Sequence, residues 1–509
     1  MWDVIVIGSG IGGLAAAASL ALCGRRVLVL EQHHGAGGLT QTFERQGWRF
    51  ATGVHYIGGV GPQPGPTGQF GRLLAWLSNG ELRFAEAGNP YDIVHLGDDT
   101  FGIRAPQAAY RSDLLQRFPR EHAEINAWFA DCAEAEGMAS RLFAMRALPP
   151  LMAWAMHQWR GRALSHWTQM TLADRLSRIA DPQLRALLGA RWGNHGAPPA
   201  SAPFFEHALV TGSYKDGAYY PIGGPARFVQ TLVPVIQAAG GEVRCSANVL
   251  RIDLEHDHVV GVRYPHDDVW HTERCGTVIS AAGVRNTIGA LPASAALLWK
   301  HTLNALQPGL AYVALYLGLE GDIAAAGATA GNHWFYDGQD IGRLWRSPAD
   351  EDAPSLFVSF PSLKDPASHA APTAEVVAVC DPQAFSSWLA VRDSTPRSEA
   401  YLAYKGWVED RLLSQFKRCF PGLAPLVRFH ELSTPLTQRR YVRSPDGAMY
   451  GIEMSGERLT TPALRARTPV PGLLLAGQDV TSPGVAGAFM GGLMAAACVE
   501  PKLLKRLAS

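Results

Sequence analysis

The chain of 509 residues has no excess of charge of either sign. Lys and Arg total 45, Asp and Glu total 45, and charged residues make up only 18% of the sequence. A general nucleic-acid binder needs a basic surplus to neutralise phosphates. We therefore expect no nucleic-acid partner, although a local charged patch is compatible with this total.

Cysteine is also scarce. The seven cysteines are dispersed along the chain, without a C-x-x-C pair or a Cys/His cluster at metal-ligand spacing. The sequence thus predicts no metal site, and an odd set of free thiols suits a reducing compartment. The 53 Gly and 34 Pro follow no period, which excludes collagen-like and low-complexity chains.

Long apolar runs are absent. The longest stretches, such as residues 488–499, are shorter than the roughly 18 to 20 residues that cross a bilayer. An apolar strand begins almost at the first residue, without the basic leader of a signal peptide. We expect no transmembrane helix and a cytoplasmic location. Peripheral association with the inner face of the membrane is compatible with this prediction.

The N-terminal residues carry the strongest pattern. Residues 4–7 are an apolar run typical of a buried parallel strand, and a glycine-rich turn and a small-residue helix follow over residues 8–23. Such glycines allow a tight turn and a close approach to a pyrophosphate, which the helix N-terminus attracts. A second strand over residues 26–30 ends at Glu31, where a carboxylate binds ribose hydroxyls. The acid favours FAD or NAD over NADP.

A second glycine pair, Gly37 and Gly38, follows six residues after Glu31. This pattern resembles the extended fingerprint of FAD enzymes in the flavin amine oxidase and carotenoid desaturase superfamily. No cysteine lies within residues 477–492 for a covalent flavin link, so we expect non-covalent FAD. The residues that the pattern and the resemblance assign to FAD are Gly8, Ser9, Gly10, Ile11, Gly12, Gly13, Glu31, Gln32, Gly37, Gly38, Leu39, Thr40, Gly53, Val54, Val249, Ala282, Gly477, Asp479, Val485 and Ala486.

Three further patterns lie over residues 51–58, residues 205–210 with 217–224, and residues 357–366, and they resemble those of retinol saturase and its relatives. A fourth, over residues 473–479 with 483–488, resembles the C-terminal FAD motif of the superfamily. The resemblance implies an α/β fold, in which a discontinuous Rossmann-type FAD domain of the amine oxidase type carries an inserted α+β substrate domain. We expect the FAD domain in residues 1–80, 211–290 and 431–509, and the substrate domain in residues 81–210 and 291–430.

Residues 138–173 contain no Asp or Glu. Basic helices that carry Trp and Leu tend to lie in a membrane interface. The pattern is equally typical of a buried helix pair, divided at Pro149 and Pro150. The segment is therefore either a region of membrane association or substrate entry, or a buried part of the substrate domain. Its Arg and Trp residues are Arg141, Arg146, Arg160, Arg162, Trp154, Trp159 and Trp167.

A flavin enzyme transfers hydride through flavin N5, while the protein orients the substrate and supplies protons. The sequence from 51 to 58 passes over the flavin ring in related folds, so His55 is our first candidate and Tyr56 accompanies it. Glu206 becomes a proton donor if an apolar cavity raises its pKa. The resemblance to retinol saturase adds His207, Lys364 and Asp365 as catalytic candidates. The absence of a second G-x-G-x-x-G motif means that an NADH or NADPH donor would have to use the flavin's own substrate cavity.

The preferred function is that of an FAD-dependent oxidoreductase that saturates a C=C bond of a lipophilic polyene, such as a retinoid or carotenoid. Desaturation or cis–trans isomerisation on the same scaffold is the nearest alternative. An amine oxidase is disfavoured, because those enzymes resemble one another in a substrate-domain lysine that residues 308–318 lack. A lipid carrier like the GDP-dissociation inhibitors is also disfavoured, because those carriers lack the intact fingerprint found here.

Overall fold

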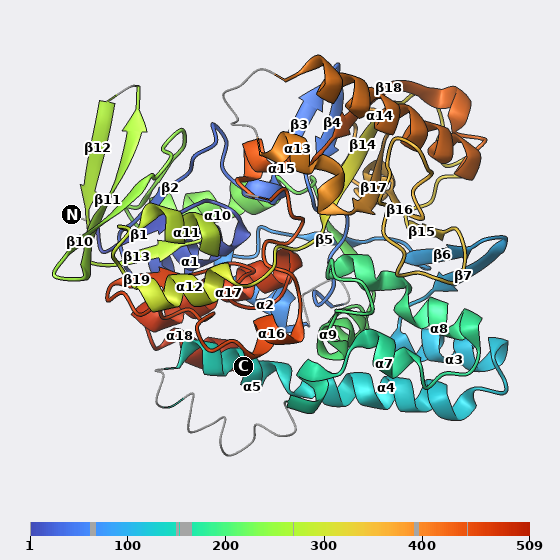
Figure 1. Ribbon diagram of the computed structural model, residues 1–509, viewed down its shortest axis with the longest axis horizontal. Coiled ribbons are helices and arrows are strands. Elements are labelled where there is room, and N and C mark those ends of the chain that lie inside the picture. The colour runs from blue at the N-terminus through green and yellow to red at the C-terminus, as the bar shows by residue number, and fades with distance from the viewer. Residues whose placement is uncertain are drawn as a thin grey trace.

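A five-stranded parallel sheet forms one half of the molecule, drawn at the left of Figure 1. The structure is a computed structural model that describes residues 2–61, 68–148, 152, 165–267, 269–390, 397–444 and 446–508. The sheet brings together strands from the start, the middle and the end of the chain. In spatial order they are β19 (Leu473–Leu475), β13 (Val278–Ser280), β1 (Val4–Ile7), β2 (Val27–Leu30) and β9 (Glu242–Arg244).

Both faces of this parallel sheet are covered, as its uninterrupted apolar strands require. Val4 and Val6 face α1 (Ile11–Leu22), α10 (Arg227–Ala238) and α17 (Gly484–Val499), and Ile5 and Ile7 face the opposite side. That second side packs against α11 (Val284–Ala290), α12 (Leu297–Asn304) and a three-stranded antiparallel sheet. The strands of this small sheet are β10 (Arg251–Glu255), β11 (His258–His266) and β12 (Val269–Arg274).

A seven-stranded sheet forms the other half of the molecule. All its neighbouring strands are antiparallel except β15 and β6. Its spatial order is β18 (Val427–Ser433), β14 (Ala311–Leu319), β17 (Thr373–Cys380), β16 (Ser355–Ser359), β15 (Asn332–Tyr336), β6 (Asp92–Leu96) and β7 (Asp99–Ile103).

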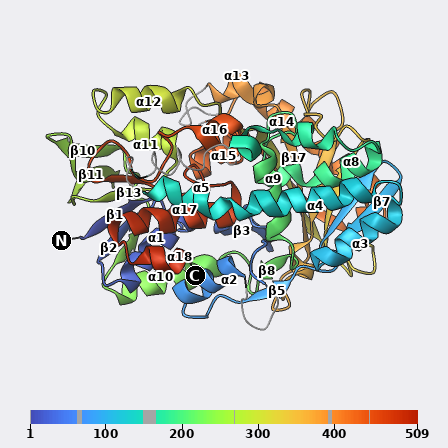
Figure 2. The same ribbon diagram turned by 90° about the horizontal axis from the view of Figure 1, so that it is seen from below.

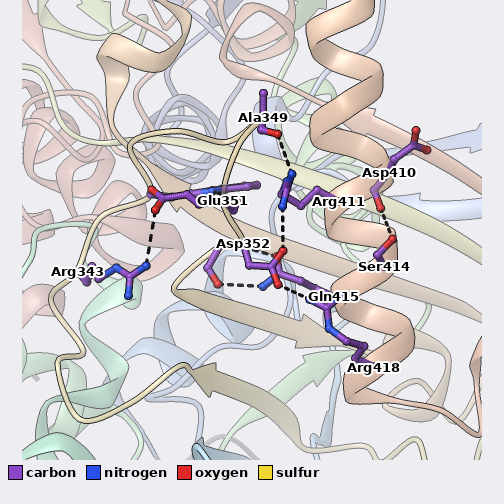
Figure 3. Close-up of polar contacts among 11 residues, drawn as sticks. Arg343, Ala349, Glu351, Asp352, Asp410, Arg411, Ser414, Gln415 and Arg418 are labelled. Carbon is purple, nitrogen blue, oxygen red and sulfur yellow. Dashed lines mark hydrogen bonds and ion pairs between the residues drawn. The ribbon is translucent and has the colours of Figure 1, made fainter.

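The two faces of this sheet have different partners because side chains alternate along each strand. On β14, Val313 and Leu315 pack in the core with α14 (Glu399–Cys419), whereas Tyr312 and Tyr316 face a cavity. The loop from residue 337 to residue 354 is fixed on α14, as Figure 3 shows. Its anchors are hydrogen bonds and ion pairs of Arg411, Gln415 and Arg418 with Ala349, Asp352 and Ala353. This anchoring holds the start of β16, whose Leu356 and Phe357 line the cavity.

A group of helices covers the cavity side of the seven-stranded sheet and lies at the lower right of Figure 1. The α4 and α9 helices pack against each other, and α5 lies beside α17 of the other half (Figure 2). These contacts join the two halves. The helices are α3 (Gln107–Arg117), α4 (His122–Gly137), α5 (Ala139–Ala147), α7 (Leu172–Leu176), α8 (Pro182–Gly189) and α9 (Phe204–Ser213).

Shorter elements complete the chain and link the two sheets. Two small antiparallel pairs form between β3 and β4 and between β5 and β8. The remaining elements are β3 (Thr42–Arg45), β4 (Trp48–Ala51), α2 (Gln69–Leu77), β5 (Phe84–Glu86), β8 (Tyr219–Pro221), α13 (Ser386–Leu389), α15 (Pro435–Val442), α16 (Gly456–Thr460) and α18 (Leu503–Ala508), with short 3-10 turns η1 (Gly38–Thr40), η2 (Ala190–Asn194), η3 (Pro361–Leu363), η4 (Pro382–Phe385) and η5 (Ala424–Leu426).

The expected α/β fold, with a parallel Rossmann-type sheet, is confirmed. Across the described ranges, no helix combines the length and the apolar character needed to cross a membrane. The exact domain boundaries expected from the sequence stay a prediction.

The segment 138–173 differs in part from the expectation of a membrane-facing surface. Arg146 is buried and donates hydrogen bonds to backbone carbonyls, and Trp167 is buried and donates from Nε1 to Glu134. These two side chains therefore form their hydrogen bonds within the protein. The expected division at Pro149 and Pro150, and the side chains Trp154, Trp159, Arg160 and Arg162, lie outside the described residues.

Candidate functional site

A cavity of about 850 Å³ is lined by residues of both halves of the molecule. One part of its lining comes from the glycine-rich turn after β1, the end of β2, the β13–α11 connection and the start of α17. The other part is a chamber of aromatic and aliphatic side chains from the seven-stranded sheet, α5, η2 and α9. Its members include Phe143, Trp192, Leu209, Val210, Tyr214, Tyr312, Tyr316, Trp334, Tyr336, Phe357, Val377 and Val379.

The first part has the form of a dinucleotide cradle. Gly8 adopts a φ of 91°, which favours glycine and allows the chain to turn from β1 into α1. The first-turn N–H groups of a helix lack partners within the helix, and those of α1 lie at the cavity because Gly10, Ile11 and Gly12 line it. A side chain at Gly10 would meet nothing within 4 Å, so this side of the turn is open.

The carboxylate of Glu31 is fixed at the end of β2. Ser9 donates its N–H and its hydroxyl to Glu31 Oε2 over 2.8 and 2.6 Å, and the His33 N–H donates to Oε1 over 2.8 Å. Gly37 then donates its N–H to the Ser9 hydroxyl over 2.9 Å. These bonds tie the glycine-rich turn, the acid and the second glycine pair into one rim of the cradle.

The opposite rim comes from the C-terminal segment. Asp479 Oδ2 accepts the N–H of Val284 over 2.9 Å, at the start of α11. The α17 helix begins at Gly484, so its N-terminus also lies at the cavity. Close packing brings α17 to α1, since a Cβ at Gly492 would lie 2.0 Å from the carbonyl oxygen of Gly12.

Most residues expected at the cofactor line this cavity. Within the described chain, the exceptions are Ser9, Gly13 and Gly37, which lie behind the residues that line the rim. Ser9 is fully buried under Glu31, and a Cβ at Gly13 would lie 2.0 Å from the Gly8 carbonyl oxygen. The expected residues that do line it are Gly8, Gly10, Ile11, Gly12, Glu31, Gln32, Gly38, Leu39, Thr40, Gly53, Val54, Val249, Ala282, Gly477, Asp479, Val485 and Ala486.

His55 lines the cavity together with Glu375, which the sequence did not single out. His55 Nδ1 lies 2.8 Å from Glu375 Oε2, a distance for an ion pair without the geometry of a hydrogen bond. Glu375 is fully buried, and its Oε1 accepts the N–H of Ala51 over 2.7 Å. The sequence contained one signal for it, a single acid within the apolar strand β17.

Tyr56 also lines the cavity, and a buried polar group holds its hydroxyl. Its O–H donates to Asp92 Oδ2 over 3.2 Å, and Asn194 Nδ2 donates to the Tyr56 oxygen over 3.0 Å. Trp334 Nε1 donates to the other Asp92 oxygen over 2.9 Å. Burial raises the pKa of Asp92 to about 6, with Arg191 4.0 Å away opposing the rise, and burial raises the pKa of Tyr56 well above its ordinary value. Tyr56 is thus a fixed hydrogen-bonding group and a weak acid.

Lys364 lies behind His55 and Tyr56. Its ammonium donates to the His55 carbonyl over 2.9 Å, to Ser359 Oγ over 2.6 Å and to Asn332 Oδ1. Burial lowers its pKa to about 7. Lys364 therefore positions the backbone of His55, and it is absent from the lining of the cavity described here.

The α9 helix forms another wall. Glu206, Leu209, Val210 and Ser213 line the cavity at positions i, i+3, i+4 and i+7, which share one face of a helix. Glu206 is buried, and its Oε1 accepts the hydroxyl of Ser482, which precedes α17. Burial raises the pKa of Glu206 to about 7, against the lowering effects of Ser482, Arg458 and Arg146.

Two catalytic candidates, His207 and Asp365, lie outside the lining of the cavity in the described chain. His207 follows Glu206 on α9 and so lies about 100° around the helix axis. Its Nε2 lies 2.8 Å from the Leu188 carbonyl oxygen and its Nδ1 3.2 Å from His195 Nε2, while burial lowers its pKa to about 3. Asp365 accepts the N–H of Gly223 over 3.1 Å at the surface. Neither side chain lines the cavity in the described chain, so the structure does not bring these two residues together with the other candidates there.

The comparisons with known proteins agree with this arrangement. Residues 11–500 match the model of the family described as flavin containing amine oxidoreductase. The all-trans-retinol 13,14-reductase of Macaca fascicularis is 32% identical over 526 residues, which cover 98% of this chain and 85% of that protein. A chloroplastic prolycopene isomerase of Arabidopsis thaliana is 26% identical and covers 89% of this chain and 74% of that protein.

Solved structures show the same fold at low sequence identity. Cyclohexylamine oxidase from Brevibacterium oxydans superimposes with a TM-score of 0.62 at 17% identity, covering 99% of each chain. An oxidoreductase from Methanosarcina mazei gives a TM-score of 0.64 at 17% identity, covering 96% of this chain and 98% of that one. The family resemblance expected from the sequence is confirmed. The chain belongs to the flavin-containing amine oxidoreductase family.

Proposed function

We propose that this flavin-dependent oxidoreductase binds FAD non-covalently in the cradle and reduces a C=C bond of a lipophilic polyene in the adjoining chamber. The residues present fit FAD. The open backbone at Gly10 and the N-termini of α1 and α17 suit a pyrophosphate, and the Glu31 carboxylate, which lines the cavity at the end of β2, suits a ribose diol. When bound, FAD supplies hydride chemistry at N5.

The observation that carries the proposal is the continuity of the cradle with an aromatic chamber. An apolar chamber favours an oily substrate, because burial of its surface is worth about 25 cal/mol per Å². A substrate bound there would lie next to the cradle that we propose for the flavin. The similarity to all-trans-retinol 13,14-reductases over nearly the whole chain supports a retinoid-like polyene and the direction of reduction.

A second candidate is cis–trans isomerisation of a polyene, which the similarity to prolycopene isomerases favours. Both reactions use the same cradle and chamber. They differ in product mass, because reduction adds two hydrogen atoms and isomerisation adds none. An external NADH or NADPH donor would reach the flavin through the same cavity.

The first experiment identifies the cofactor. The purified protein should be yellow, and heating should release FAD that chromatography identifies. A colourless protein that FAD does not reconstitute would refute the proposal. The released nucleotide also distinguishes FAD from FMN.

The second experiment identifies the reaction. The holoenzyme is reduced with dithionite without oxygen and mixed with all-trans-retinol, and the products are separated and weighed by mass spectrometry. We expect oxidation of the flavin and a product two hydrogen atoms heavier. A product of unchanged mass would favour isomerisation, and NADH or NADPH in place of dithionite tests the external donor.

A further inference from the structure

The acids that line the cavity have different partners. Glu31 and Asp479 accept backbone N–H groups in the cradle, and Glu375 accepts the Ala51 N–H and lies against His55. Glu206 uses Oε1 for the Ser482 hydroxyl, while its buried Oε2 has no hydrogen-bond partner among the described residues. A buried oxygen without a partner is costly when it carries charge and much less costly when it carries a proton.

Two guanidinium groups stand near Glu206 without forming an ion pair with it in the described part of the chain. Arg146 from α5 donates to the carbonyls of Val480, Arg458 and Leu459 over 2.8 to 3.0 Å. Arg458 from α16 donates to the carbonyls of Ile452 and Gln478. Their hydrogen bonds are thus committed to the backbone around the C-terminal rim of the cradle.

The charged groups that act on Glu206 are therefore Arg146 and Arg458, and the Ser482 hydroxyl adds one hydrogen bond. Asp479 acts on Arg458 and offsets part of its field. The two cations do not outweigh burial, so the carboxyl holds its proton up to about neutral pH, at its pKa of about 7. The same cations and the Ser482 hydroxyl stabilise the carboxylate once the proton has left.

We infer that Glu206 is the proton donor of the reduction, an assignment that rests on the proposed function. The C=C π bond breaks. One carbon forms a C–H bond with the proton of the Glu206 carboxyl group, whose O–H bond breaks, and its neighbour forms a C–H bond with the hydride, which carries both electrons from the reduced flavin. Glu206 is left as a carboxylate and takes a proton from solvent after the product leaves.

The two first candidates from the sequence, His55 and Tyr56, are less suited to this step. The Tyr56 O–H already donates to Asp92, and the raised pKa of Tyr56 makes it a weak acid. His55 Nδ1 lies 2.8 Å from Glu375 Oε2, so this ring nitrogen is engaged by a buried carboxylate of the seven-stranded sheet. His55 and Tyr56 thus shape and orient the chamber, and Glu206 supplies the proton from the α9 wall.

The test compares Glu206→Gln with Glu136→Gln as a matched control. Gln keeps the size of the side chain and an oxygen for the Ser482 hydroxyl but has no proton to give. Glu136 lies on α4, packs against Gly212 of α9 and pairs with Lys215 over 3.5 Å, outside the cavity lining. Reduced holoenzymes are mixed with all-trans-retinol in D₂O, and saturated product is measured by rate and by deuterium content.

We expect Glu206→Gln to bind FAD and to form saturated product at least 100-fold more slowly, in the range of general acid catalysis of about 10²–10⁴. Glu136→Gln should retain the wild-type rate, with two solvent deuterium atoms in each product molecule, because the N5 hydrogen of a flavin reduced in D₂O also comes from solvent. Equal rates in the two variants would overturn the assignment of Glu206 and leave the proposed function intact.

Infrared spectroscopy of the FAD-loaded protein without substrate gives a readout that does not depend on turnover. We expect the wild type to show a carboxylic C=O band that disappears with an apparent pKa near 7 and that is missing in Glu206→Gln. If the wild type lacks this band at pH 6, the assignment of Glu206 is wrong. If the band is found but the wild type does not reduce a polyene, the proposed function fails, and with it the role of Glu206 as proton donor.

Discussion

Replacing Glu206 by Gln should change the pH dependence of stability between pH 5 and pH 8. In the folded protein the pKa of Glu206 is about 7, against 4.5 for the side chain in the unfolded chain, because burial disfavours the carboxylate. The folded state therefore holds the proton more strongly than the unfolded state. The stabilising contribution of the protonated group is complete below pH 4.5 and is lost as the pH rises toward 7.

The magnitude follows from the two pKa values. At about 1.4 kcal/mol per pKa unit, the total change approaches 3.4 kcal/mol, and linkage places about 2.5 kcal/mol of it between pH 5 and pH 8. Gln is neutral over this range and keeps an acceptor for Ser482. The free energy of unfolding of Glu206→Gln, relative to wild type, should therefore increase by about 2.5 kcal/mol from pH 5 to pH 8.

Urea unfolding of the FAD-loaded wild type, Glu206→Gln and Glu136→Gln at both pH values, at constant ionic strength, measures this difference. The Glu136 variant should run parallel to the wild type, because that residue forms only a partly exposed ion pair. The reasoning is refuted if the difference between wild type and Glu206→Gln is the same at pH 5 and pH 8. It would then follow that Glu206 is ionised in the folded protein across the whole range.

Three further variants test the packing and the polar groups of the site. Gly492→Ala places a Cβ 2.0 Å from the Gly12 carbonyl oxygen and so forces α1 away from α17. The substitution should lower the free energy of unfolding by about 1–3 kcal/mol or more and weaken FAD binding. Thermal unfolding and flavin fluorescence measure the two effects. Lys364→Met removes a donor from three buried acceptors and should lower the free energy of unfolding by about 3 kcal/mol in urea; an unchanged midpoint would contradict the ammonium's role. His55→Ala should retain FAD but slow flavin reoxidation by a polyene in stopped-flow measurements, whereas an unchanged rate would exclude His55 from the reaction.

Local patterns gave correct predictions where all their information lies in a short stretch. The run from Val4 to Ile7, the glycine turn and the run from Val27 to Leu30 form the predicted strand, turn and strand, because uninterrupted apolar residues need a strand covered on both faces. Glu31 lies at the cavity for the same reason, at the end of its strand. The spacing of Glu206, Leu209, Val210 and Ser213 was also available in the sequence as a helix face.

Contacts between distant segments could not be predicted in this way. Glu375 meets His55 only because β17 passes under the loop after β4, 320 residues away in the chain. The choice between Glu206 and His207 required knowing which face of α9 lies against the cavity. The composition of residues 138–173 suggested a membrane surface. Arg146 of this segment instead donates hydrogen bonds to carbonyls of residues more than 300 positions later in the chain.

A row of polar side chains on the cavity face of the seven-stranded sheet explains why the two ends of the chamber differ. Asp92 is paired with Asn332 across β6 and β15, Ser359 with Glu375 across β16 and β17, and Lys364 joins the row through Asn332 and Ser359. Each member is held by neighbours, so this wall is a fixed scaffold for His55 and Tyr56. The α9 wall instead presents Glu206, whose Oε2 has no hydrogen-bond or ion-pair partner among the described residues, whereas the unbonded Glu375 Oε2 faces His55 Nδ1 over 2.8 Å. The proposed reaction needs one proton at one carbon, and Glu206 can give it without disturbing the hydrogen bonds that hold His55 and Tyr56 on the opposite wall.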